Sequence, residues 1–316
     1  MTKGFPNANR EVYVAIAADE NYYKYAAVSL CSAASTLCDG WKLFAVLLDG
    51  GLSSEARLFL DKMARKHNFE LSFFTQCDGS DFDSLPEMAH WTRAMYLRFS
   101  IGECMPLRAS RALYLDCDVL VSDSLHELFE IPFDGQSICA VENLNQDRYS
   151  ELGLLGDGYF NSGVLLIDLN SWRSRDCKSK AIEIGIDRRE HLAFPDQDIL
   201  NVLFDGDTKL LNWRFNLQAP MFGDPHITGV LSKGVVVTHF TSNSKPWHPG
   251  DAHPFRKQYR EFAARSGVDL CIPKPTFISS LKWLKRTLQR YGYFHATYSL
   301  FHRSCTLSQL CPETTQ

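Results

Sequence analysis

Short apolar runs alternate with amphipathic segments in the N-terminal part of the chain. The apolar runs are residues 12–17, 42–48 and 70–74. Their composition is typical of buried strands. Residues 21–36 and 53–67 lie between the runs and have the spacing of helices, and Ser53 is a suitable N-cap for the second. This strand–helix alternation predicts an α/β fold with a parallel sheet.

Further apolar runs continue the pattern toward the C-terminus. They are residues 112–115, 138–141, 163–169 and 235–240. Residues 163–169 (GVLLIDL) form the most apolar of the predicted strands. No repeat or low-complexity block precedes residue 270. We therefore expect a single α/β catalytic domain over residues 1–270 and a small helical appendage over residues 271–316.

The composition of the 316-residue chain is that of an ordinary globular protein, with 45% hydrophobic and 22% charged residues. No apolar run reaches the roughly 18 residues of a membrane-spanning helix. The first eleven residues lack the apolar stretch of a secretory signal. The ten cysteines are scattered without a Cys-x-x-Cys pair, which favours reduced, buried thiols in a cytoplasmic protein. We expect no nucleic-acid partner.

The C-terminal segment differs in charge from the rest of the chain. The net charge is −4, yet residues 270–312 contain no Asp or Glu. The basic residues there are Lys274, Lys282, Lys285, Arg286, Arg290 and Arg303. Ile278, Leu281, Leu284 and Leu288 recur at helical spacing in this segment. Either the helix packs on the body with its charges in water, or it binds an anionic membrane surface; the absence of acidic residues favours the membrane.

Two aspartates follow the predicted strand 112–115. In an extended chain Asp116 and Asp118 share a face while Cys117 points away, so both carboxylates can bind one divalent cation. His239, at the end of the strand 235–240, adds an imidazole, and this mixed set suits Mn²⁺ better than Ca²⁺, with Mg²⁺ also possible. Taken separately, an Asp-x-Asp more often caps a turn, and such a histidine is more often a packed one.

Other polar residues follow predicted strands, where α/β sheets bind their ligands. Lys245 lies in a hydroxyl-rich loop and can hold a phosphate, although a solvated lysine is the simpler interpretation. Asp19 and Asn21 follow the first strand and can contact a nucleotide, cap a helix, or do both. Residues 196–198 open a helix, where capping is again the alternative. No phosphate-loop, nucleophile-elbow or zinc-helix motif offers a different chemistry.

Five segments, taken in order, resemble glycosyltransferase family 8. They are residues 17–22 (AADENY), 114–121 (YLDCDVLV), 159–166 (YFNSGVLL), 196–201 (DQDILN) and 239–248 (HFTSNSKPWH). The resemblance runs from about residue 11 to residue 250 and is greatest to bacterial lipooligosaccharide and lipopolysaccharide α-galactosyltransferases and glucosyltransferases. The family often has a glycine at the position of Ser242, and the serine hydroxyl here can donate to an oxygen instead.

This resemblance implies a GT-A type fold, with a Rossmann-like, mostly parallel sheet flanked by helices. It also implies a UDP-hexose donor, Mn²⁺ and retention of the anomeric configuration. The implied metal ligands are Asp116, Asp118 and His239. The implied donor-binding residues are Ala17, Asp19, Asn21, Arg98, Asn161, Ser162, Ser242 and Lys245. Asp196 and Gln197 are the implied catalytic residues beside the hexose, and His90 aligns with an acceptor-side residue.

The expected function is transfer of galactose or glucose from UDP-galactose or UDP-glucose to a saccharide acceptor. The expected acceptor is the lipopolysaccharide core, and the expected location is the inner face of the cell membrane. A cation and Lys245 would stabilise the UDP leaving group. Both Gln197 as a weak nucleophile and front-face attack by the acceptor stay open. The alternatives are a glycogenin-like transferase with a non-lipid acceptor and a non-catalytic sugar-nucleotide sensor.

Overall fold

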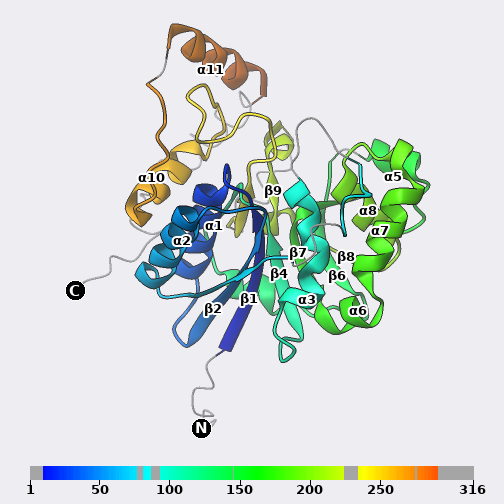
Figure 1. Cartoon of the computed structure of the whole chain (residues 1–316). Helices are drawn as coiled ribbons and strands as arrows, with labels where there is room; N and C mark the ends of the chain where they lie inside the picture. Colours follow the sequence, from blue (N-terminus) through cyan, green and yellow to red (C-terminus); the bar gives the residue numbers. More distant parts are fainter. Residues whose placement is uncertain are drawn as a thin grey trace, which may run out of the picture.

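The computed structural model describes residues 10–76, 81–86, 93–144, 146–223, 234–274 and 276–290. Within them, a seven-stranded sheet in the order β3-β2-β1-β4-β7-β6-β8 forms the centre of the molecule, and helices flank it (Figure 1). The strands of this sheet are β1 (Arg10–Ala18), β2 (Trp41–Asp49), β3 (Glu70–Phe74), β4 (Arg111–Leu115), β6 (Ile138–Glu142), β7 (Phe160–Asp168) and β8 (Thr208–Leu211).

The predicted α/β fold with a mostly parallel sheet is confirmed. β1 pairs in parallel with β2 and β4, β2 with β3, and β6 with β8. β7 is the exception, because it runs antiparallel to both β4 and β6. It also begins at Phe160, three positions before the predicted start. All but the last of its residues are buried, so its apolar character reports burial and carries no information on strand direction.

Helices connect many of these strands along the chain. The α-helices are α1 (Tyr23–Ser35), α2 (Ser54–Lys66), α3 (Ile101–Cys104), α4 (Leu125–Phe129), α5 (Asp147–Leu152), α6 (Leu169–Ser174), α7 (Cys177–Asp187), α8 (Pro195–Leu203), α10 (Arg256–Ser266) and α11 (Phe277–Arg290), and the 3-10 helices are η1 (Arg93–Ser100), η2 (Arg189–His191), η3 (Trp213–Phe215) and η4 (Ala219–Gly223). The N-cap of α2 is the predicted one, since Ser53 Oγ accepts a hydrogen bond from Ala56 N at 3.1 Å.

A second, three-stranded sheet was not predicted. It has the order β5-β10-β9, and its strands are β5 (Val119–Val121), β9 (Leu217–Gln218) and β10 (Val237–His239). β10 is shorter than the predicted strand 235–240 and pairs antiparallel with β5, which sets His239 opposite Val119. β5 and β9 are too short to show a periodic pattern, and only their pairing with β10 reveals them.

The segment predicted as a C-terminal appendage contains the helix α11, which stands apart from the main sheet at the top of Figure 1. Its Trp283 contacts a small apolar cluster that includes Leu217, Met221 and Ala252. Residues 291–316, the rest of the predicted appendage, lie outside the described part of the chain. Among the described helices, none is long and apolar enough to cross a membrane.

The buried thiols predicted from the sequence lie inside the molecule. Cys31, Cys117 and Cys139 are buried. Burial raises the pKa of Cys31 and of Cys139 to about 12, because a thiolate would lose its hydration there. These three residues are therefore part of the core.

Candidate active site

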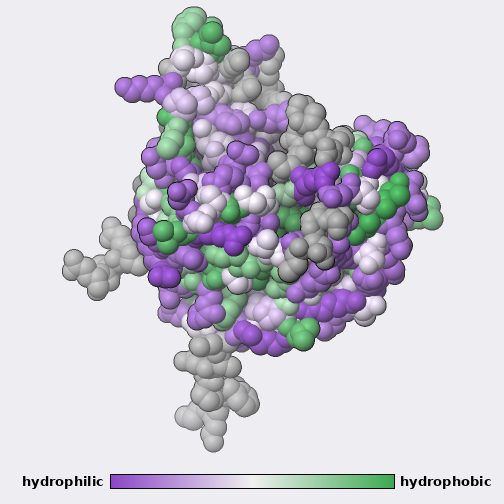
Figure 2. Space-filling model, in the orientation of Figure 1, coloured by the Kyte–Doolittle hydropathy of each residue, from purple (hydrophilic) through white to green (hydrophobic). Residues whose placement is uncertain are grey.

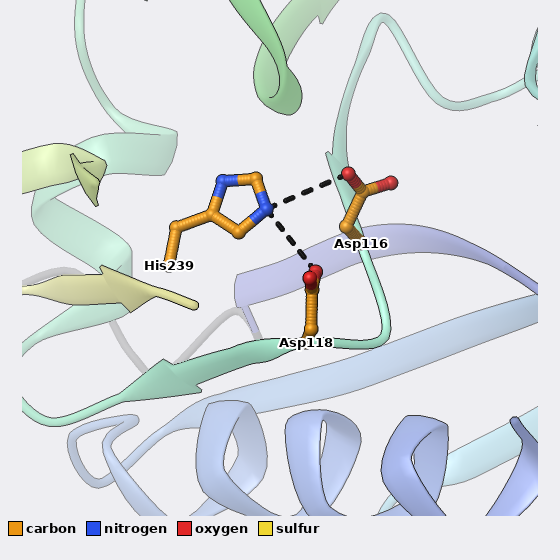
Figure 3. A group of neighbouring side chains, drawn as sticks. All are labelled: Asp116, Asp118 and His239. Carbon is orange, nitrogen blue, oxygen red and sulfur yellow. Dashed lines mark hydrogen bonds and ion pairs between the residues drawn. The ribbon is translucent and has the colours of Figure 1, made fainter. Parts of the chain in front are cut away.

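Three side chains from two elements meet at the carboxyl end of β4. Asp116 and Asp118 lie between β4 and β5, and His239 ends β10. His239 Nε2 is 3.1 Å from Asp118 Oδ1 and 3.6 Å from Asp116 Oδ2 (Figure 3). One ligand atom from each residue lies within 4.8 Å of the other two. The structure therefore brings together the three residues that the sequence predicted as metal ligands.

The local route to this arrangement differs from the predicted one. We expected an extended segment to put both carboxylates on one face, but β4 ends at Leu115 and a turn occupies the next positions. The turn directs both carboxylates toward His239, while Cys117 Sγ donates to the carbonyl of Ala17 at 2.9 Å. Cys117 points away from the site, as predicted, and the cause is a turn.

The donor set fits a hard divalent cation. Two carboxylates and one imidazole nitrogen are ligands for Mn²⁺ or Mg²⁺. The floor of this site is Gly163 of β7. A β-carbon at Gly163 would overlap His239 Cε1 and Asp116 Oδ2, and it would lie only 3.0 Å from Asp116 Cγ. The space above β7 is thus kept open by the absence of a side chain.

A lysine completes the charge arrangement around Asp118. Lys245 Nζ is 2.5 Å from Asp118 Oδ2 and donates to the carbonyl of Phe240 at 2.7 Å. Burial opposes ionisation of Asp118, but the Lys245 ammonium beside it is the largest opposing influence, and the pKa of Asp118 lies well below its usual value. Ser242 in the same loop donates to the carbonyl of Ser244 at 2.6 Å, so its hydroxyl is engaged within the loop.

The loop that carries Lys245 is anchored by an aromatic contact. The ring of Trp247 stacks on that of Tyr25 of α1, with centroids 3.6 Å apart and planes at 10°. Offset or parallel ring contacts of this kind stabilise a local arrangement beyond simple burial. The loop therefore presents Lys245 to the site from a fixed base.

Arg98 of η1 links the metal-site carboxylates to α8. Its guanidinium donates to Asp116 Oδ1 at 2.9 Å and lies 2.8 Å from Asp196 Oδ2, and it also bonds Ser162. The ring of Tyr114 lies 4.5 Å from the guanidinium carbon. Burial disfavours the charged form, but Asp196, Tyr114 and Asp116 raise the pKa of Arg98 above its usual value. Arg98 is thus a buried cation that bridges two carboxylates.

The N-terminal turn of α8 supplies the residues expected beside the hexose. Gln197 Oε1 accepts from Asn161 Nδ2 at 3.0 Å and from Ser162 N at 3.1 Å, so β7 and α8 are tied together here. Ser162 Oγ donates to Asp196 Oδ2 at 3.3 Å. Burial raises the pKa of Asp196, and Arg98 opposes the shift.

The third acidic residue of this segment has a different environment. Asp198 is fully buried and pairs with Arg148 at 2.6 Å. Its Oδ2 accepts hydrogen bonds from Ala193 N and Phe194 N, directly before α8. Asp198 is therefore an acidic first-turn residue that holds the amides before α8, whose N-cap residue is Phe194. Asp196 faces the site through Arg98.

The residues predicted at the nucleotide end follow β1. Asp19 is buried, and its Oδ1 accepts from Asn21 N at 2.9 Å and from Tyr22 N at 3.1 Å. These bonds form an Asx turn that leads into α1, whose N-cap residue is Tyr22 without a side-chain cap hydrogen bond. Ala17 is adjacent through its carbonyl, which accepts from Cys117. His90, the predicted acceptor-side residue, lies outside the described residues.

Three residues of the site were missed by sequence reasoning. Tyr114 donates to Asp116 Oδ1 at 3.0 Å, Asn216 contacts His239 at 3.0 Å, and Gly163 underlies both ligands. The glycine carried a signal, because a glycine inside an apolar strand often marks a close approach of another group. No feature of the sequence distinguished Tyr114 and Asn216 from residues that simply pack in the core.

A family model and several known proteins match the part of the chain that contains this site. The family model for glycosyl transferase family 8 matches residues 13–250, which contain every described site residue named above. General stress protein A of Bacillus subtilis is 26% identical over 263 residues, which cover 78% of this chain and 91% of that protein. Lipopolysaccharide 1,3-galactosyltransferase of Salmonella typhimurium is 27% identical over 270 residues, covering 82% and 79%.

A solved structure shares the architecture. The crystal structure of the galactosyltransferase LgtC in complex with donor and acceptor sugar analogues superposes with a TM-score of 0.72 at 28% identity. The match covers 80% of this chain and 96% of that one. This likeness confirms the predicted GT-A type fold.

Proposed function

This chain belongs to glycosyl transferase family 8, and we propose that it moves galactose or glucose from a UDP-sugar to a saccharide acceptor with the help of Mn²⁺. One observation carries the proposal. Asp118 faces both His239 and Lys245, so a cation site and a phosphate-binding cation share one carboxylate. A bound metal ion and the Lys245 ammonium would then be two neighbouring positive charges, which suits the binding of a diphosphate.

The chemistry follows from where charge develops. The bond between the anomeric carbon and UDP breaks, and negative charge grows on the diphosphate. A divalent cation held by Asp116, Asp118 and His239 would supply Lewis-acid stabilisation of that charge. Lys245 adds a mobile ammonium on the same side.

Retention of configuration through front-face attack is supported by Gln197. Its Oε1 already accepts two hydrogen bonds, from Asn161 and Ser162, so both lone pairs are occupied. A nucleophilic role would require these bonds to break. In the proposed reaction the acceptor hydroxyl oxygen forms the new bond to the anomeric carbon as the bond to UDP breaks, and its proton passes to a phosphate oxygen of the departing UDP.

The acceptor proposed here is the lipopolysaccharide core. The support is the likeness to a lipopolysaccharide 1,3-galactosyltransferase over 82% of the chain. Roles for Ala17, Asp19, Asn21, Arg98, Asn161, Ser162 and Ser242 in holding the donor, and for Asp196 and Gln197 beside the hexose, are part of this proposal. We also propose His90 on the acceptor side, from its place in the sequence alone.

The C-terminal segment, residues 271–316, is proposed to hold the enzyme on an anionic membrane surface on the cytoplasmic side. The support is an exposed apolar face on α11, formed by Phe277, Ile278, Leu281 and Leu284. Figure 2 shows a hydrophobic (green) patch at the top of the molecule, where Figure 1 shows α11. An apolar helix face within a stretch (residues 270–312) that has basic residues and no acidic ones is typical of interfacial membrane binding.

The test is a donor panel with purified full-length protein, Mn²⁺ and core oligosaccharide acceptors, read as UDP release and as the anomeric configuration of the product. We expect turnover with UDP-galactose or UDP-glucose, an α-linked product, and loss of turnover in EDTA.

The variant Asp116→Asn should lower kcat by about 10²–10³-fold, because a transition-state electrostatic partner is removed. Full activity in EDTA would contradict the metal assignment. Binding of UDP-sugar without turnover on any saccharide would favour a sensor, and turnover on glucan acceptors alone would favour a glycogenin-like enzyme.

A further inference from the structure

A chain of three buried carboxamides runs from His239 to α8. Asn216 contacts His239, Asn161 contacts Asn216, and Gln197 contacts Asn161, with distances of 3.0, 2.9 and 3.0 Å. Asn216 has no exposed surface, and the other two are more than nine-tenths buried. The chain therefore connects the predicted metal ligand with the predicted hexose side of the site.

The orientation of two of these amides is fixed by backbone groups that can only donate. Gly163 N donates to Asn161 Oδ1 at 3.1 Å, and Ser162 N donates to Gln197 Oε1 at 3.1 Å. Both side-chain oxygens must therefore face β7. The NH₂ group of Asn161 then donates to Gln197, and the NH₂ group of Gln197 donates to Tyr159 at 2.9 Å.

The far end of the chain is fixed in the same sense. The hydroxyl of Tyr159 donates to Asp198 Oδ1 at 2.6 Å. The paired carboxylate of Asp198 is an acceptor only, which leaves the Tyr159 oxygen as the acceptor for Gln197. Each of these hydrogen-bonded side chains thus donates in the same direction, away from His239.

This direction determines the orientation of Asn216. Asn161 Oδ1 requires a donor, so Asn216 presents its Nδ2 to Asn161 and its Oδ1 to His239 Nδ1. An amide oxygen accepts, and the proton between these atoms belongs to His239 Nδ1. In the neutral imidazole, Nε2 then carries the lone pair, and Nε2 is the nitrogen that faces Asp116 and Asp118.

We propose that Asn216 is a positioning residue that fixes the tautomer of His239 and directs the Nε2 lone pair at the cation position. This inference rests on the metal site of the proposed function. Histidine ligands usually donate their second ring N–H to a partner, and loss of the partner typically costs 10–100-fold in metal affinity or activity. Here the partner is in turn oriented by β7 and α8.

Two substitutions of Asn216 separate its two hydrogen bonds. Asn216→Ala removes the acceptor for His239 and the donor for Asn161. Asn216→Asp keeps an acceptor for His239 Nδ1–H and replaces the donor to Asn161 with a carboxylate oxygen. A matched control is Asn201→Ala, because Asn201 is an equally buried amide that bonds Phe160 and the carbonyl of Gln197 without contacting His239.

The experiment measures the Mn²⁺ dissociation constant of the full-length protein at saturating UDP, from the electron paramagnetic resonance signal of free Mn²⁺. We expect Asn216→Ala to weaken Mn²⁺ binding by about 10–100-fold and Asn216→Asp to restore most of it. Asn201→Ala should lower Tm and leave Mn²⁺ binding near that of the wild type. Thermal melting of each variant establishes that it is folded.

Several outcomes overturn the inference. These are a folded Asn216→Ala that binds Mn²⁺ like the wild type, an Asn201→Ala that weakens binding equally, or a folded Asn216→Asp without rescue. If Asn216→Ala does not fold, the Mn²⁺ affinity of Asn216→Asp tests the inference instead.

A second test is nitrogen NMR of ¹⁵N-histidine-labelled wild type with Mg²⁺ and UDP. That spectrum should show a protonated Nδ1 on His239, and a protonated Nε2 refutes the proposal. A wild type that binds no Mn²⁺ with UDP refutes the metal site as well, whereas unchanged binding in the variant refutes only the role of Asn216.

Discussion

Gly163 of β7 lies against the imidazole of His239 so closely that no side chain fits between them. The backbone of Gly163 does not have a positive φ, so any residue could adopt its conformation. The requirement for glycine at this position is therefore steric, and it comes from the metal site above the strand.

Gly163→Ala should displace His239 and Asp116 and leave the strand intact. We expect weaker Mn²⁺ binding and a fall in kcat of about 10²–10³, comparable to loss of one electrostatic partner of the transition state. The control is Gly102→Ala, whose β-carbon would lie 2.9 Å from Trp172 Cδ1, away from the site, and should lower Tm without changing the Mn²⁺ dissociation constant. If Gly163→Ala has the kcat and the Mn²⁺ affinity of the wild type, a β-carbon fits at this position and the steric argument is wrong.

Lys245→Ala should lower kcat more than it raises the KM for the UDP-sugar. The reason is that charge on the diphosphate grows as the bond to the hexose breaks, so the ammonium contributes more in the transition state than in the ground state. Steady-state kinetics with varied donor measure both constants. Lys209→Ala, which removes a lysine paired with Asp134, is the control and should change neither. A rise in KM alone would mean that Lys245 contributes only uniform donor binding.

Membrane association should depend on the apolar face of α11. Full-length protein should sediment with anionic vesicles at low salt, since basic residues near anionic lipid contribute about 1 kcal/mol each. The double variant Ile278→Glu, Leu281→Glu should remain in the supernatant, as should a chain ending near Leu270. Leu58→Glu alters an exposed leucine of α2 and should sediment like the wild type. The assignment fails if the α11 variant and the wild type partition equally.

Acid should destabilise the protein through His253. This residue is buried, and burial lowers its pKa from 6.5 to about 3. Because the folded-state pKa is the lower one, the neutral form contributes full stability above pH 6.5, and that stability is lost as the pH falls toward 3. Between pH 7 and pH 5 the linkage relation gives a loss of about 2 kcal/mol from this residue.

Urea unfolding at pH 7 and pH 5 measures this loss. His253→Gln should be less stable at pH 7, because the ring contact with Phe240 at 4.5 Å is removed, yet it should lose about 2 kcal/mol less between the two pH values. Equal pH dependence in His253→Gln and the wild type would contradict the assignment.

Local patterns predicted six of the seven strands of the main sheet and missed β8. β3 was predicted with its observed bounds, Glu70–Phe74, because the apolar run and its flanking residues define a strand without reference to the rest of the chain. The start of α2 followed from a single side-chain cap. The short strands β5 and β9 were not predicted, since a segment of three residues or fewer carries no periodicity.

The sequence by itself determined an α/β domain and the identity of the residues that gather at the carboxyl end of β4, because apolar runs and polar strand ends are local features. The tertiary structure decided how these residues meet. Asp118 and His239 are 121 positions apart, and their contact depends on the pairing of β5 with β10. The tertiary structure also decided the direction of β7 and the role of Asn216. Strand direction and amide orientation depend on which donors and acceptors become neighbours, and that information exists only after the chain has folded.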